Sequence, residues 1–195
     1  MTSRLVLGSA SPRRREILQG LGLEFEVLPS HADEPAFAGG DVARYALTLA
    51  RTKAEAVVAT LRGDGATVLA ADTIVVVDDE VLGKPADRAE SRHMLGRLAG
   101  RHHDVVTAVV VRDVRGGFHQ CAERTRVWFR CCSEQELNRY AATGEGDDKA
   151  GAYAIQGIGA GLVDRIEGSY TNVVGLPAAQ AIELLRAAGA LGEWP

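Results

Sequence analysis

The sequence is poor in cysteine and aromatic residues, and it has no long apolar run. Its three cysteines are Cys121, Cys131 and Cys132. This odd number without CxxC spacing argues against a disulfide framework and against a zinc site. Aromatic residues make up 5% of the chain, too few for a stacking face that binds RNA. No stretch is long enough to span a membrane, and the N-terminus lacks a signal-peptide pattern. We therefore expect a cytoplasmic protein with no membrane or nucleic-acid partner.

Several familiar catalytic motifs are also missing. Gly8 is not followed by the Gly-Lys-Ser/Thr of a Walker loop, and Gly83-Lys84 runs into Pro85. No G-x-S-x-G segment that would place a nucleophilic serine occurs. The five histidines show no metal-ligand spacing. These absences exclude P-loop nucleotide binding, a serine-hydrolase elbow and a histidine metal centre.

Lysine is scarce as well. Only Lys53, Lys84 and Lys149 are lysines among the 22 basic residues, and the net charge is -4. Coding bias would explain the preference for arginine. In such a chain, each remaining lysine raises the question of what a compact ammonium group does there that a guanidinium group cannot do. A local basic site on an acidic protein fits a small anionic ligand better than a nucleic acid.

The 195 residues, 46% of them hydrophobic, can bury the core of a single domain spanning residues 1–195. Apolar periodicity and capping signals predict strands over 4–7, 23–28, 67–77, 104–114 and 118–130. They predict helices that begin at Pro12, Asp41, Asp87, Ser133 and Pro177 and end near residues 20–22, 61, 98, 142 and 189. Residues 143–176 are glycine-rich, and we expect them to be irregular. Strands and helices mix without strict alternation, so the fold class is α/β (mixed α+β) with a mixed sheet.

The most informative segment is the start of the first helix. Ser11 is a candidate N-cap and Pro12 a natural first helical residue. Arg13, Arg14 and Arg15 then lie at the positive end of the helix dipole, where cations are disfavoured by roughly 0.3–1 kcal/mol each. A surface cluster of arginines is one interpretation. The preferred one is that a polyanion completes the site, because helix N-termini and guanidinium groups both bind phosphate.

Two charged residues interrupt apolar patterns. Lys53 falls on the core-facing stripe of the helix over 41–61, where it either extends to solvent or meets an anion. Asp72 interrupts an apolar, β-branched strand, where an unpaired carboxylate would cost several kcal/mol. Asp72 therefore caps a nearby turn, or it is paired and placed for proton abstraction or metal binding.

Three residues outside regular elements are weaker candidates. Lys84, between Gly83 and Pro85, can reach a ligand or simply face solvent from a turn. Glu34 lies in the 29–40 loop and could supply an oxygen ligand for Mg²⁺, although alone it reads as a surface residue. Gln156 offers a donor and an acceptor suited to the edge of a base.

Five blocks together resemble the Maf (septum-formation inhibitor) family of nucleoside triphosphate pyrophosphatases. In chain order they are Ser9-Ala10-Ser11-Pro12-Arg13-Arg14, Ala71-Asp72-Thr73, Leu82-Gly83-Lys84-Pro85, Lys149 through Gly157, and Asn172-Val173-Val174-Gly175-Leu176-Pro177. The resemblance runs from Leu5 through the final helix. It implies two lobes around a central cleft, an architecture related to the inosine triphosphate pyrophosphatases, and often a homodimer.

The resemblance also implies cleavage between the α- and β-phosphates with a divalent cation, Mg²⁺ or Mn²⁺. Asp72 would activate water, and Glu34 with Asp72 would hold the metal. The substrate would be bound by Ser9, Arg13, Arg14, Lys53, Thr73, Lys84 and Gln156. Within the family, Arg13, Thr73 and Gln156 resemble members that act on dTTP and UTP rather than on 7-methyl-GTP. The family name suggests a role in restraining cell division. The alternative is a nucleotide-binding regulator with little turnover.

Overall fold

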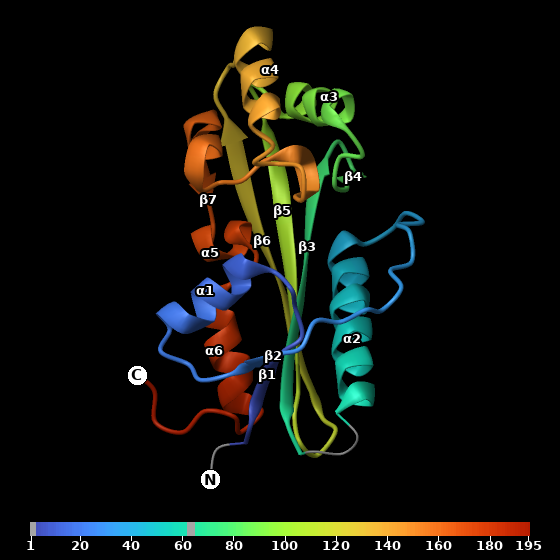
Figure 1. Ribbon diagram of the computed structural model, residues 1–195, viewed down its shortest axis with the longest axis vertical. Coiled ribbons are helices and arrows are strands. Elements are labelled where there is room, and N and C mark those ends of the chain that lie inside the picture. Colours follow the sequence, from blue (N-terminus) through green and yellow to red (C-terminus); the bar gives the residue numbers. More distant parts are fainter. Residues whose placement is uncertain (1–2, 62–64) are drawn as a thin grey trace. The chain divides into compact units, whose positions relative to one another are not determined.

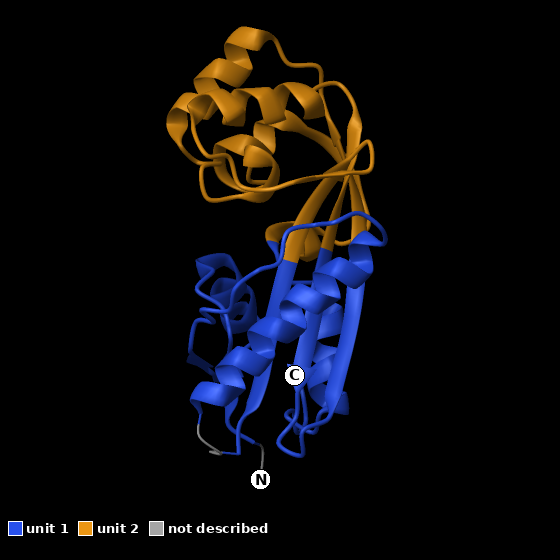
Figure 2. Cartoon of the chain, turned by 90° about the vertical axis from the view of Figure 1, so that its right-hand side faces the viewer, with its two compact units in different colours: residues 1–72, 107–123, 175–195 blue, residues 73–106, 124–174 orange. Residues whose placement is uncertain are grey.

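A computed structural model describes residues 3–61 and 65–195 of the chain. The chain divides into two compact units, which Figure 2 shows in different colours. Unit 1 comprises residues 1–72, 107–123 and 175–195, and unit 2 comprises residues 73–106 and 124–174. The boundary between the units falls inside three strands, so each of these strands contributes residues to both.

The described residues form a seven-stranded mixed sheet with the path β2-β1-β3-β5-β6-β7, and β4 pairs with β3. The strands are β1 (Leu5–Leu7), β2 (Glu26–Val27), β3 (Thr67–Val77), β4 (Glu80–Leu82), β5 (His102–Arg112), β6 (Phe118–Phe129) and β7 (Val163–Glu167). β1 runs parallel to β2 and β3, whereas β3–β4 and β6–β7 are antiparallel. The predicted mixed α/β class is thus confirmed.

Unit 1 covers both faces of its strands with helices. These are α1 (Pro12–Gly20), α2 (Val42–Thr60) and α6 (Ala178–Ala187). Figure 1 shows α1 and α6 on one side of the strands and α2 on the other. Leu18 of α1 and Leu185 of α6 pack with Leu7, Leu69 and Val109 from the strands. Their burial removes a large apolar surface from water and holds the helices on the sheet.

Unit 2 contains α3 (Arg88–Leu98), α4 (Glu134–Thr143) and α5 (Tyr170–Val174), with 3₁₀ turns at Ala150–Ala152 and Gly157–Leu162. Its β3–β4 hairpin turns through Asp78 and Asp79, which have φ values of 52° and 60°. Two-residue hairpin loops of this kind require positive φ at both positions, and aspartate tolerates it. The predicted caps of α3 and α4 are confirmed at Asp87 and Ser133.

Two predictions of secondary structure were wrong. The strand over 23–28 shortens to Glu26–Val27, because the N–H of Leu23 donates to the carbonyl of Leu18 at the end of α1. The irregular segment 143–176 contains β7 and α5, and β7 pairs with β6 with Val127 opposite Ile166. None of the helices within residues 3–61 and 65–195 has the length and apolar character to cross a membrane.

Candidate functional site

The N-terminus of α1 has the structure that the sequence predicts. Ser11 is the N-cap, with its hydroxyl accepting from the backbone N–H of Arg14, and Pro12 opens the helix. The first turn contains no acidic residue. The positive end of the helix is therefore not neutralised by carboxylates in its own first turn.

Arg14 is held in place by unit 1 itself. Its Nε donates to the carbonyl of Gly175 at 2.8 Å, and its Nη1 donates to Oγ of Ser9 at 3.0 Å. The same Ser9 oxygen accepts from the N–H of Ser11 at 3.2 Å. Burial lowers the pKa of Arg14, while the negative charges of Asp72 and Glu34 oppose that shift and Arg13 adds to it. The guanidinium is thus fixed in position and interacts electrostatically with both acids.

Lys53 connects the two predicted metal-ligating acids. It projects from the middle of α2, and its Nζ lies 2.9 Å from Oε1 of Glu34 and donates to Oδ1 of Asp72. The side chains of Lys53 and Asp72 are 16% and 11% exposed, whereas that of Glu34 is 53% exposed. Lys53 thus meets two anionic side chains of the protein itself and does not simply extend to solvent. Asp72 lies within β3 and is paired, so the interpretation of a turn cap is wrong.

The environment of Asp72 raises the pKa of its carboxyl group above the ordinary value. Burial raises its pKa, and the nearby charge of Glu34 raises it further. Lys53, through its charge and its hydrogen bond, and Arg14 pull the pKa down but do not cancel the effect of burial. A carboxylate with a raised pKa binds a proton more strongly than an exposed one, which suits a general base.

The same acids fit a hard divalent cation. Glu34 and Asp72 both present an oxygen atom to the Lys53 ammonium group, so the two carboxylates lie close to one another, with that ammonium group between them. No group of three or more histidine, cysteine or acidic residues that could hold a metal occurs within the described ranges, 3–61 and 65–195. Mg²⁺ does not need such a group, because one or two carboxylates and substrate phosphates suffice.

Three predicted substrate residues belong to unit 2. Thr73 follows Asp72 in β3 and is half-buried, and Lys84 is exposed just after β4. Gln156 is half-buried at the start of a 3₁₀ turn, where Glu145 accepts from the N–H groups of Ile158 and Gly159 at 2.9 and 2.8 Å. The structure gathers Ser9, Arg14, Lys53, Asp72 and Glu34 within unit 1. The roles of the unit 2 residues stay predictions.

Sequence reasoning missed Tyr45. Its hydroxyl donates to the carbonyl of Pro35 at 2.8 Å, beside Glu34. Burial raises the pKa of Tyr45, the charges of Asp72 and Glu34 raise it further, and Lys53 lowers it. The available signal was spacing, because Tyr45 lies eight residues before Lys53 on the stripe that also carries Leu49.

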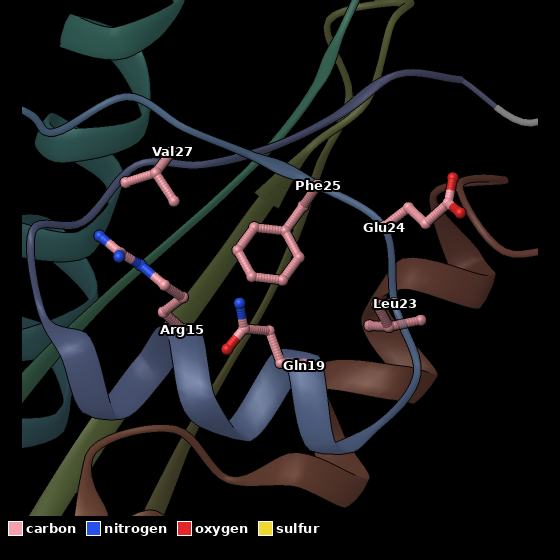
Figure 3. A pocket seen from close by; sticks show the side chains of 6 residues that line it. All are labelled: Arg15, Gln19, Leu23, Glu24, Phe25 and Val27. Carbon is pink, nitrogen blue, oxygen red and sulfur yellow. The ribbon is translucent and has the colours of Figure 1, made fainter.

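A separate pocket lies on the surface of unit 1. It has a volume of about 470 Å³ and is lined by Arg15, Gln19, Leu23, Glu24, Phe25 and Val27 (Figure 3). None of the predicted site residues lines it. Arg15 therefore faces a different part of unit 1 from Arg14, which contacts Ser9 and Gly175.

Comparison with known proteins gives a match over most of the chain. The family model described as "Maf-like protein" matches residues 4–188. A dTTP/UTP pyrophosphatase from Geobacter metallireducens is 48% identical over 190 residues, covering 97% of this chain and 98% of that protein. A dTTP/UTP pyrophosphatase from Anaeromyxobacter sp. is 50% identical over 194 residues, covering 97% and 91%.

Solved structures resemble the fold. The Staphylococcus aureus Ham1 protein matches with a TM-score of 0.52 and 15% identity, over 94% of this chain and 96% of that one. A HAM1 protein from Coxiella burnetii matches with a TM-score of 0.51 and 16% identity, over 95% and 97%. At these identities the likeness concerns the architecture alone.

Proposed function

Because this chain belongs to the Maf family, we propose that it is a nucleoside triphosphate pyrophosphatase that converts dTTP and UTP to monophosphate and pyrophosphate. Relatives that are named dTTP/UTP pyrophosphatase match it over nearly its whole length at close to half identity. The single observation that carries the proposal is the buried Asp72, paired with Lys53 and near Arg14. A base and two cations in one place suit water attack on a polyphosphate.

In the proposed reaction, Asp72 takes a proton from a water molecule whose oxygen attacks the α-phosphorus. The bond from the α-phosphorus to the bridging oxygen breaks, and pyrophosphate leaves with the electron pair. The raised pKa of Asp72 supports its role as proton acceptor. Lys53 and Arg14 would bind the phosphate oxygens, since ammonium and guanidinium groups both pair with phosphate.

Glu34 and Asp72 would hold the divalent cation, Mg²⁺ or Mn²⁺, because both carboxylates lie within reach of one ammonium group and carboxylates are the ligands that these cations take. When bound, the cation supplies charge neutralisation and polarisation of the phosphate oxygens. Ser9 would act by holding Arg14, to which it is hydrogen bonded.

The family pattern, and not a contact with Asp72 or Lys53, supports the roles of the remaining substrate residues. Arg13 and Lys84 would contribute charge to the triphosphate. Thr73 and Gln156 would contact the nucleoside, for which the Gln156 amide offers a donor and an acceptor. Small changes in the residues that contact the base alter the preference for one base over another. The base preference is therefore tested with a panel of nucleoside triphosphates.

The deciding experiment incubates the purified protein with Mg²⁺ or Mn²⁺ and a panel of nucleoside triphosphates, and scores pyrophosphate and orthophosphate separately. We expect pyrophosphate, released fastest from dTTP and UTP. Fastest release of pyrophosphate from 7-methyl-GTP or another nucleoside triphosphate would support the proposed reaction and refute the proposed preference for dTTP and UTP. Tight binding without turnover of any nucleotide would favour the regulator. A homodimer, a cytoplasmic location and a restraint on cell division stay predictions.

A further inference from the structure

The segment that carries Glu34 has little regular structure to hold it. Residues 28–40 connect β2 to α2 and contain neither helix nor strand. Two side chains of α2 contact this segment at consecutive residues. Lys53 pairs with the carboxylate of Glu34 at 2.9 Å, and Tyr45 donates to the carbonyl of Pro35 at 2.8 Å.

The ion pair by itself is a weak anchor. The Glu34 side chain is 53% exposed, and solvent screens the attraction between an exposed carboxylate and its partner. Lys53 also donates to Asp72, so Glu34 shares that ammonium group with a more deeply buried acid. A contact to the backbone of this segment would add to the hold of the ion pair on Glu34.

Tyr45 supplies such a contact. Its ring also packs against Phe37 of the same segment, with a centroid distance of 5.0 Å. The phenolic hydroxyl is a hydrogen-bond donor, and it donates to the Pro35 carbonyl at 2.8 Å. Because Pro35 follows Glu34 directly, fixing its carbonyl restricts the backbone that carries the Glu34 side chain.

We propose that Tyr45 is a positioning residue that, through its hydrogen bond to the Pro35 carbonyl, holds Glu34 where it can ligate the divalent cation. This inference rests on the proposed function in one respect, namely that Glu34 is a metal ligand. Tyr45 itself touches neither the cation nor the substrate. Its effect should therefore vanish when Glu34 can no longer ligate.

A double-mutant cycle tests this dependence. Mn²⁺ affinity is measured on the protein without nucleotide, from the free Mn²⁺ signal by electron paramagnetic resonance. The four proteins are wild type, Tyr45→Phe, Glu34→Gln and the double variant. Tyr45→Phe keeps the ring on Phe37 and removes only the hydroxyl. We expect it to weaken Mn²⁺ binding about 5-fold in the wild type, the size of one lost hydrogen bond, and to have no effect beside Glu34→Gln.

A matched control removes another hydroxyl from α2. Thr48 donates to the Arg44 carbonyl within the helix at 3.0 Å, so Thr48→Val should leave Mn²⁺ affinity unchanged. The inference is overturned if Tyr45→Phe weakens binding equally in both backgrounds, or not at all. The same cycle on kcat/KM gives a second measure. Wild-type protein that releases no pyrophosphate would instead refute the proposed function, which the Mn²⁺ titration does not require.

Discussion

Lys53 and Glu34 are joined by a 2.9 Å ion pair, although one belongs to α2 and the other to the preceding loop. The same lysine donates to Asp72, so a single ammonium group contacts both acidic side chains in the protein without substrate. The ammonium group between the two carboxylates offsets part of their mutual repulsion, although the pKa of Asp72 stays raised.

Replacing Lys53 by methionine removes the positive charge between the two acids. The pKa of Asp72, which Lys53 lowers, should rise further, since the repulsion from Glu34 is then unopposed by Lys53. The acidic limb of the kcat/KM profile should therefore move to higher pH, and the KM for the triphosphate should increase about tenfold or more. A pH series from 5 to 9 checks both effects. Lys53→Arg keeps the charge and should leave the limb nearer its wild-type position, and an unmoved limb in Lys53→Met would contradict the prediction.

Asp72→Asn should abolish turnover while sparing nucleotide binding. The amide cannot accept the proton from water, and general-base catalysis contributes about 10²- to 10⁴-fold in rate. Two measurements on the same preparation separate the two effects. They are the rate of pyrophosphate release from UTP and the equilibrium binding of its non-hydrolysable α,β-imido analogue. Asp79→Asn is the control, because Asp79 is exposed in a turn and asparagine tolerates its φ of 60°. Retained turnover in Asp72→Asn would assign the base to another residue.

His103 should make the stability of the protein depend on pH. It is 2% exposed, its Nε2 is hydrogen bonded to the hydroxyl of Tyr153 at 2.7 Å, and burial lowers its pKa from 6.5 to about 4. Between pH 6.5 and about 4, His103 is protonated in the unfolded chain and neutral in the folded chain. The free energy of unfolding should thus fall as pH drops through that window, by roughly 3 kcal/mol at most.

Urea unfolding of wild type and His103→Gln at pH 7 and pH 5 measures this contribution. The variant should lose less stability between the two pH values than the wild type does. His93→Gln removes an exposed histidine from α3 and should keep the wild-type dependence. Parallel behaviour of wild type and His103→Gln would show that other groups cause the pH effect.

Gly146 should tolerate no side chain. A Cβ at this position would lie 1.9 Å from the carbonyl oxygen of Ala152. This clash is with backbone, which cannot move away as the end of a flexible side chain can. Gly146→Ala should therefore lower the free energy of unfolding by about 2 kcal/mol or more. Gly161→Ala is the matched control, because a Cβ there meets nothing within 4 Å. Thermal unfolding compares the two, and equal Tm values would contradict the packing argument.

The fold was predictable where local signals agree. α2 begins at Val42 after the Asp41 cap because the capping aspartate and the apolar stripe point to the same boundary. β7 was missed because its pairing with β6 joins residues about 40 positions apart, as with Val127 and Ile166. No local pattern in a glycine-rich segment reveals such a partner.

The site was predictable to the extent that charge interrupts apolar patterns. Lys53 and Asp72 stand out for that reason, and the structure pairs them. Glu34 has no such signal, since it lies among polar loop residues. Tyr45 was missed because a tyrosine on a helix face reads as ordinary packing, and its partner is a backbone carbonyl that the sequence does not mark.

The hydrogen bond from Arg14 to the carbonyl of Gly175 spans 161 positions of the chain. During synthesis from the N-terminus, the helix that carries Arg14 is made long before its partner exists. The arginine cannot reach its final position until the last segment of unit 1, residues 175–195, has been added. A protein truncated before Gly175 would lack this hydrogen bond, so the contact that joins Arg14 to the C-terminal segment forms only when translation is nearly complete.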